Sequence, residues 1–65
     1  MKMVRIFCLD DGTSYWFHAG TAYEAMRKLQ YTLDLRKGDR AAIHKTESGK
    51  HLYLEHDGKT YAARI

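Results

Sequence analysis

Apolar and polar side chains alternate along several short segments of this chain, as they do in a strand with one buried face. The first two segments differ, because both their odd-numbered and their even-numbered positions carry apolar residues. The stretch from Ile6 to Phe17 reads IFCLDDGTSYWF, with Asp11-Gly12 at its middle. Glycine takes the positive φ of a tight hairpin turn at little cost, so three dipeptides predict hairpins: Asp11-Gly12, Ser48-Gly49 and Asp57-Gly58. The pattern therefore predicts two strands near the start of the chain and three near its end.

Each predicted turn also sets a register, because a slip by one residue would move every side chain to the opposite face. The first hairpin is expected to pair Cys8 with Tyr15, Ile6 with Phe17 and Val4 with Ala19 on one face, and Phe7 with Trp16 and Arg5 with His18 on the other. The hairpin at Asp57-Gly58 is expected to pair Leu54 with Tyr61 and Leu52 with Ala63 on one face. On its opposite face it is expected to pair Tyr53 with Ala62 and His51 with Arg64. The middle hairpin joins Ile43 to Leu54 and Lys45 to Leu52 on one face, and His44 to Tyr53 and Thr46 to His51 on the other.

Between Gly20 and Gly38 the spacing changes to that of a helix. Thr21 followed by Glu24 is typical of a capping box, which satisfies backbone N–H groups at a helix start. An apolar stripe at helical spacing follows: Ala22, Met26, Leu29 and Leu33. We expect one helix of about four turns that ends near Arg36, Lys37 and Gly38.

The resulting order, ββαβββ, predicts a single α+β domain over residues 1–65. It is a two-layer sandwich in which one helix packs on one face of a mostly antiparallel five-stranded sheet. Either the third or the fifth strand can lie beside the first. The predicted core is Val4, Ile6, Cys8, Tyr15, Phe17, Ile43, Leu52, Leu54, Tyr61 and Ile65.

A single helix can cover only one face of such a sheet, so the other face is expected to be open. The same registers place an aromatic and basic set there: Met3, Phe7, Leu9, Trp16 and Tyr53 among Arg5, His18, His44, His51 and Arg64, with Glu55 as the one acid. A contiguous apolar patch on a small protein usually marks an interface.

Composition narrows the class of protein. The 65 residues are 45% hydrophobic, contain no proline and carry a net charge of +3, which describes a foldable, mildly basic chain. One cysteine cannot form an internal disulfide, so a reducing, cytoplasmic setting is expected. No apolar run reaches the roughly 20 residues of a membrane span, and no export signal is expected.

Residue patterns for catalysis or metal binding are weak. Asp10, Asp11 and Asp57 lie at turns, where aspartate bonds to the main chain, and Cys8 faces the predicted core. His18, His44 and His51 share a face, but solvated strand histidines are commoner than metal ligands. Phosphate-binding loops and nucleophile elbows are absent. We therefore expect no enzyme, no metal or other cofactor and no small-molecule substrate.

The predicted function is a small interaction module. The open face would bind a protein partner, either a second copy or a larger protein for which this chain is an adaptor or inhibitor. Phe7, Trp16 and Tyr53 would anchor it with Leu9, and the arginines would lie towards the margin. The full predicted site is Phe7, Trp16, Tyr53, Arg5, His18, Leu9, His51 and Arg64. The alternative is a nucleic-acid module that stacks single-stranded bases on the same rings, and strand addition at a sheet edge is a third mode.

Overall fold

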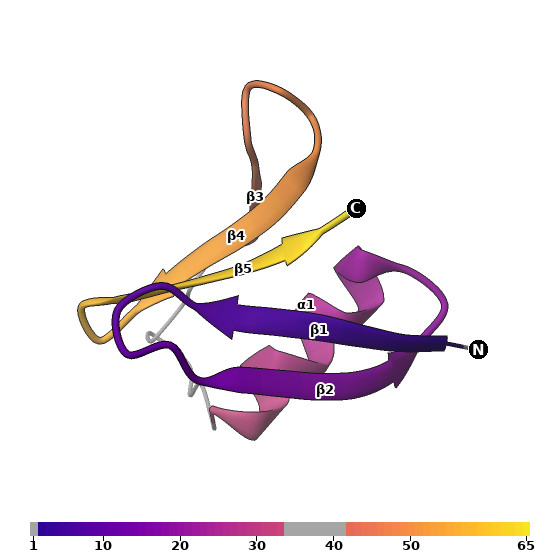
Figure 1. Cartoon of the computed structure of the whole chain (residues 1–65), viewed down its shortest axis with the longest axis horizontal. Helices are drawn as coiled ribbons and strands as arrows, with labels where there is room; N and C mark the ends of the chain where they lie inside the picture. The colour runs from indigo at the N-terminus through magenta and orange to yellow at the C-terminus, as the bar shows by residue number, and fades with distance from the viewer. Residues whose placement is uncertain (1, 34–41) are drawn as a thin grey trace.

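The computed structural model describes residues 2–33 and 42–65 and shows a five-stranded antiparallel sheet with one helix behind it (Figure 1). The elements are β1 (Lys2–Cys8), β2 (Ser14–Ala19), α1 (Ala22–Thr32), β3 (His44–Lys45), β4 (His51–His56) and β5 (Lys59–Arg64). The strand order is β2-β1-β5-β4-β3. This confirms the predicted α+β sandwich, and it puts the fifth strand, not the third, beside the first.

The β4–β5 hairpin has the predicted register. Asp57 (φ 53°) and Gly58 (φ 77°) are both in the left-handed region that a two-residue turn requires. All four predicted pairs are present, from Leu54 opposite Tyr61 to His51 opposite Arg64. A two-residue turn leaves no freedom in the alignment, which is why the sequence defines this hairpin fully.

The β3–β4 hairpin keeps the predicted register over a shorter length. His44 lies opposite Tyr53 and Lys45 opposite Leu52, and the Thr46 N–H donates to the His51 carbonyl at 3.0 Å. Because β3 begins at His44, the expected pair between Ile43 and Leu54 lies outside the ladder.

The predicted register of the β1–β2 hairpin is wrong by two residues. Arg5, not Phe7, lies opposite Trp16, while Phe7 lies opposite Ser14. The turn is a four-residue loop, residues 9–12, in which the Cys8 N–H donates to the Thr13 carbonyl at 2.8 Å. A shift of two leaves every side chain on its predicted face, because strand side chains alternate with a period of two. The partners across the hairpin are nevertheless different.

Helix α1 begins with the predicted cap. The Thr21 hydroxyl accepts a hydrogen bond from the Glu24 N–H at 3.1 Å, and the Glu24 carboxylate accepts one from the Gly20 N–H at 2.8 Å. The helix ends at Thr32, with Leu33 as its C-terminal cap. Its expected end near residues 36–38 lies outside the described residues.

The core lies between α1 and the sheet. Its buried members are Val4, Ile6, Cys8, Ala19, Ala22, Ala25, Met26, Leu29, Leu54, Tyr61 and Ala63, and Tyr15, Phe17, Leu33, Ile43 and Leu52 pack against them partly buried. The prediction of Ile65 in the core is wrong, since it is 58% exposed. Pairing of β5 with β1 ends at Ala63, and Ile65 instead follows the β4 side of the sheet, where its N–H donates to the Lys50 carbonyl.

Candidate functional site: the open face of the sheet

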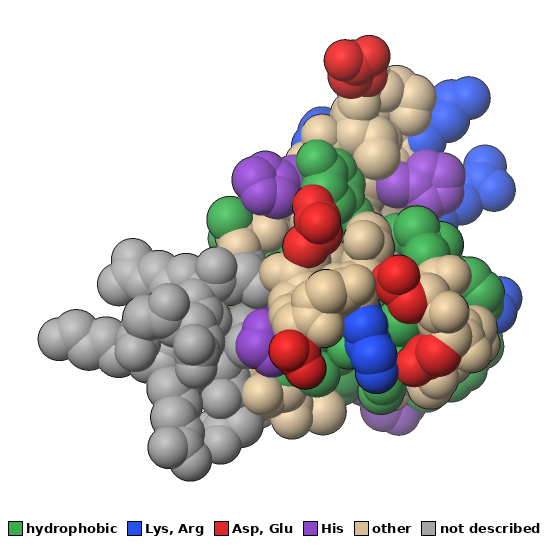
Figure 2. Space-filling model, turned by 90° about the vertical axis from the view of Figure 1, so that its left-hand side faces the viewer, with side chains coloured by type: hydrophobic (Ala, Val, Ile, Leu, Met, Phe, Trp, Pro, Cys, Tyr) green, Lys and Arg blue, Asp and Glu red, His purple; other side chains and the backbone are tan. Residues whose placement is uncertain are grey.

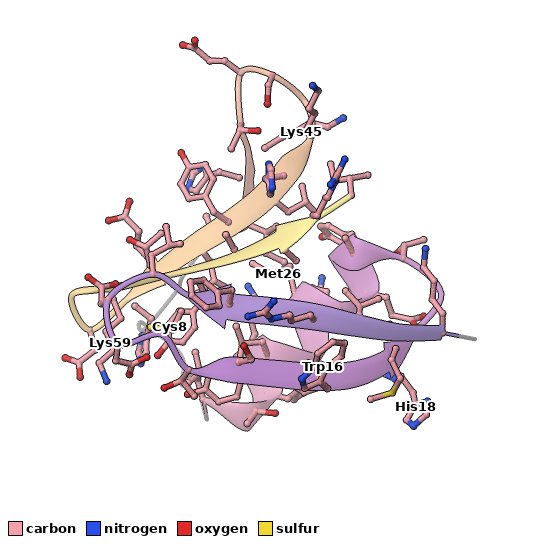
Figure 3. All side chains as sticks on the ribbon, in the orientation of Figure 1. Cys8, Trp16, His18, Met26, Lys45 and Lys59 are labelled. Carbon is pink, nitrogen blue, oxygen red and sulfur yellow. The ribbon has the colours of Figure 1, made fainter. Side chains whose placement is uncertain are left out.

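We call the face of the sheet opposite α1 the open face. Its side chains come from every strand: Met3, Arg5, Phe7, Ser14, Trp16, His18, His44, His51, Tyr53, Glu55, Thr60, Ala62 and Arg64. Figure 3 looks onto this face, with Trp16 in front of β2 and α1 behind the sheet. In the described part of the chain α1 is the only helix, and it contacts β1, β2, β4 and β5 from the other side.

Arg5 lies at the centre of the β1–β2 part of the open face. Its Nε donates to the Ser14 hydroxyl at 2.9 Å, and its guanidinium carbon lies 5.0 Å from the centroid of the Phe7 ring. Trp16 is directly opposite on β2 and is 57% exposed. The expectation of arginines only at the margin is therefore wrong for Arg5, because the two-residue change in register brings it beside Trp16.

A second group of rings lies on β3 and β4. The imidazole of His44 and the ring of Tyr53 have centroids 5.3 Å apart at an interplanar angle of 30°. Ala62 of β5 lies opposite both Phe7 and Tyr53, so these two aromatic residues are separated by a small side chain. Two strand spacings place their backbones about 10 Å apart. The open face therefore carries two aromatic groups, Phe7 with Trp16 and His44 with Tyr53. The small side chain of Ala62 separates them.

Basic and acidic side chains lie towards opposite ends of the strands on the open face. His51 lies opposite Arg64, and with Arg5 and His18 they form its basic part. Glu55 lies towards the other end of β4. That end of the sheet holds the loops with Asp10, Asp11 and Asp57, and Figure 2 shows acidic side chains gathered there around a basic one.

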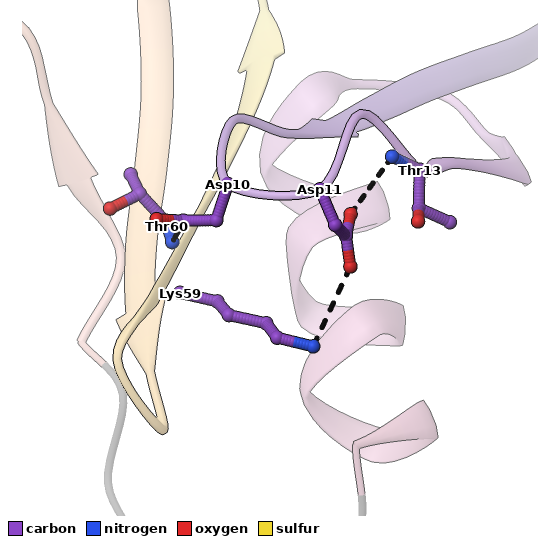
Figure 4. A network of polar contacts seen from close by, with 5 residues as sticks. All are labelled: Asp10, Asp11, Thr13, Lys59 and Thr60. Carbon is purple, nitrogen blue, oxygen red and sulfur yellow. Dashed lines mark hydrogen bonds and ion pairs between the residues drawn. The ribbon is translucent and has the colours of Figure 1, made fainter.

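The aspartates at this end hold the first loop in place (Figure 4). The Asp11 carboxylate accepts a hydrogen bond from the Thr13 N–H at 2.9 Å and lies 3.5 Å from the Lys59 ammonium. Hydrogen bonds from Thr13 are the main reason that the pKa of Asp11 lies well below its usual value, and the charge of Asp11 raises the pKa of Lys59. Asp10 accepts from the Thr60 N–H at 2.6 Å, which ties the loop to β5.

The described residues can also be examined for a metal site, a reactive cysteine and a membrane-spanning helix. Within residues 2–33 and 42–65, no three histidine, cysteine, aspartate or glutamate side chains gather closely enough to hold a metal ion. The Cys8 thiol is free and buried in the core, as its predicted face requires. The one helix in the described ranges is too short and too polar to cross a membrane.

Seven of the eight predicted site residues lie together on the open face: Arg5, Phe7, Trp16, His18, His51, Tyr53 and Arg64. The eighth, Leu9, is 61% exposed in the loop beyond β1, and its N–H donates to the Thr60 carbonyl. Sequence reasoning missed Ser14, which fixes Arg5, and Ala62, which separates the aromatic groups. Only the correct pairing of β1 with β2 and β5 could have identified them.

Comparison of the chain with protein-family models, curated proteins and solved structures finds no match.

Proposed function

We propose that this chain is a small, non-catalytic adaptor whose open face binds another protein. The partner surface that fits it has an apolar centre and acidic residues around it. The observation that carries the proposal is the pairing of exposed Trp16 with a fixed Arg5. Tryptophan, tyrosine and arginine are the residues that most often supply the binding energy of protein interfaces.

The fixed position of the Arg5 side chain favours strong binding. A free arginine loses rotamer freedom when a partner binds, and this loss weakens association. Here the bond to Ser14 and the contact with Phe7 hold the guanidinium before any partner arrives. Its remaining N–H groups can then donate to a partner carboxylate at a lower entropic cost.

Charge favours a different protein over a second copy on this face. The open face carries Arg5 and Arg64 against the single acid Glu55. Two copies packed face to face would bring this excess of like charge together. An acidic surface would instead complement it and speed the encounter.

The test compares two exposed aromatic residues on opposite sides of the molecule. Trp16 is 57% exposed on the open face, and Tyr23 is 52% exposed on α1. A partner captured from the native host is purified, and its affinity is measured by calorimetry for wild type, Trp16→Ala, Arg5→Ala and Tyr23→Ala. We expect the first two variants to bind roughly 30-fold more weakly, as for interface residues worth about 2 kcal/mol, and Tyr23→Ala to bind as wild type. Equal affinity for all four proteins would refute the proposal.

Single-stranded nucleic acid is the second candidate. It is favoured by the two separated aromatic groups with arginines beside them, since bases stack on exposed rings while arginines contact phosphates. In that case oligonucleotides quench the Trp16 fluorescence, and affinity falls steeply with salt. Arg5→Ala would reduce the salt slope by about one phosphate contact. Unchanged fluorescence at low salt would eliminate this candidate and leave protein binding.

A further inference from the structure

The two edges of the sheet differ in how well they are protected against pairing with another strand. Natural edge strands are usually short, charged, bulged or interrupted by proline. One edge, β3, has two residues and carries Lys45. The other edge, β2, has six residues of sequence SYWFHA, without Lys, Arg, Asp, Glu or Pro. By these criteria β2 is a long, nearly neutral edge.

The backbone groups on the outer side of β2 can be assigned. The bond from the Cys8 N–H to the Thr13 carbonyl shows that Thr13 faces β1. Alternate residues of an antiparallel strand face the same neighbour, so Tyr15, Phe17 and Ala19 also bond to β1. The N–H and C=O groups of Ser14, Trp16 and His18 therefore point outward from the sheet.

One side chain occupies part of this edge. The Lys28 ammonium, from α1, donates a hydrogen bond to the His18 carbonyl. Lysine is a common protector of sheet edges. Its side chain is flexible, so an incoming strand can displace it.

We propose that β2 pairs with β2 of a second copy, antiparallel across a two-fold axis at Trp16, to form one sheet of ten strands. In this register Ser14 lies opposite His18 of the partner subunit, and Trp16 lies opposite Trp16 of the partner subunit. All three outward residues then form hydrogen-bonded pairs, which gives about six main-chain hydrogen bonds. Tyr15 lies opposite Phe17 of the partner subunit, and no like charges meet within the paired strands.

This edge pairing keeps both open faces on the same side of the longer sheet. The two Trp16 side chains become cross-strand neighbours, a pairing that favours aromatic residues. The inference rests on the main chain of β2 and stands independently of what the open face binds.

The direct test is amide hydrogen exchange by NMR, with sedimentation at protein concentrations up to about 1 mM. We expect a dimer in which the outward amides of Ser14, Trp16 and His18 exchange as slowly as the amides of Tyr15 and Phe17. A strict monomer would overturn the inference, and so would a dimer in which the three outward amides exchange rapidly. Slow exchange of these amides only after a different protein is added would also overturn self-pairing.

Ser14→Pro tests the main-chain pairing, and Lys28→Met and Trp16→Ala separate this inference from the proposed function. Ser14→Pro removes one outward donor from each subunit, so the dimer should weaken roughly 30-fold, since each hydrogen bond is worth about 0.5–1.5 kcal/mol. Lys28→Met frees the His18 carbonyl and should strengthen the dimer several-fold. Trp16→Ala removes the open-face anchor but keeps every main-chain bond, so it should lose partner binding while the outward amides stay protected. Loss of that protection in Trp16→Ala would refute pairing through the main chain.

Discussion

One methionine lies between α1 and the sheet and another lies on the open face, so the same substitution at these two positions tests the architecture. Met26 of α1 is fully buried, whereas Met3 of β1 is 47% exposed on the open face. Met26→Ala and Met3→Ala remove the same atoms. Any difference in their cost therefore reports which face is covered by the helix.

The expected cost of Met26→Ala is about 3 kcal/mol. Three buried heavy atoms lose about 2 kcal/mol of transfer free energy at roughly 0.8 kcal/mol each. A residual cavity of about 40 Å³ at about 24 cal/mol per Å³ adds about 1 kcal/mol. The same change at Met3 leaves no cavity and loses a half-exposed side chain, so it should cost less than about 1 kcal/mol.

Urea unfolding followed by far-ultraviolet circular dichroism measures both variants. A domain of this size is expected to have a total stability of about 3–10 kcal/mol, so Met26→Ala can lie close to unfolding in water. Met26→Leu conserves volume and should cost less than about 1.5 kcal/mol, which keeps the comparison measurable. Equal costs for Met26→Ala and Met3→Ala would refute the assignment of a covered and an open face.

Three further predictions concern the turns and the helix start. Asp11→Asn keeps the acceptor for the Thr13 N–H but removes the charge whose pKa is lowered in the folded state. Wild type should therefore have the higher thermal midpoint near neutral pH and lose this advantage as the pH falls below about 4; a difference that stays constant with pH would contradict the electrostatic origin. Gly58→Ala should lower the free energy of unfolding in urea by about 1 kcal/mol, because the φ of Gly58 is 77°. Gly20→Ala should cost less, since Gly20 has no positive φ and no atom lies within 4 Å of the added carbon. Similar losses in the two variants would argue against the left-handed turn. Thr21→Ala should lower the free energy of unfolding by about 1 kcal/mol, with Thr21→Ser near wild type, and no loss in the alanine variant would contradict the cap.

The sequence was most informative where short-range chemistry decides the structure. The hairpin at Asp57 and Gly58 has the register that its turn residues predict, because both take the positive φ of a two-residue turn. Thr21 and the apolar stripe after it likewise define the start and the buried face of α1. Strand alternation was enough to sort seven of the eight site residues onto one face.

The first hairpin shows what local reasoning could not reach. Its glycine fits a tight turn at Asp11-Gly12, but the loop is lengthened and held by a residue from the far end of the chain. The Leu9 N–H donates to the Thr60 carbonyl, and Asp10 accepts from the Thr60 N–H. These contacts depend on β5 lying beside β1, a choice that the sequence pattern left open. The cross-strand partners of Arg5 and Phe7 depend on this strand order.

The short ladder between β1 and β5 has a consequence for how the chain folds. It consists of three residue pairs, from Ile6 with Ala63 to Cys8 with Tyr61, and it joins segments near opposite ends of the 65-residue sequence. Each hairpin can close quickly by itself, but this ladder must bring together distant residues and requires a large loss of chain entropy. Joining of the β1–β2 hairpin to the three strands β3–β5 should therefore be the slow step of folding, and until it occurs the open face exists only as two separate halves.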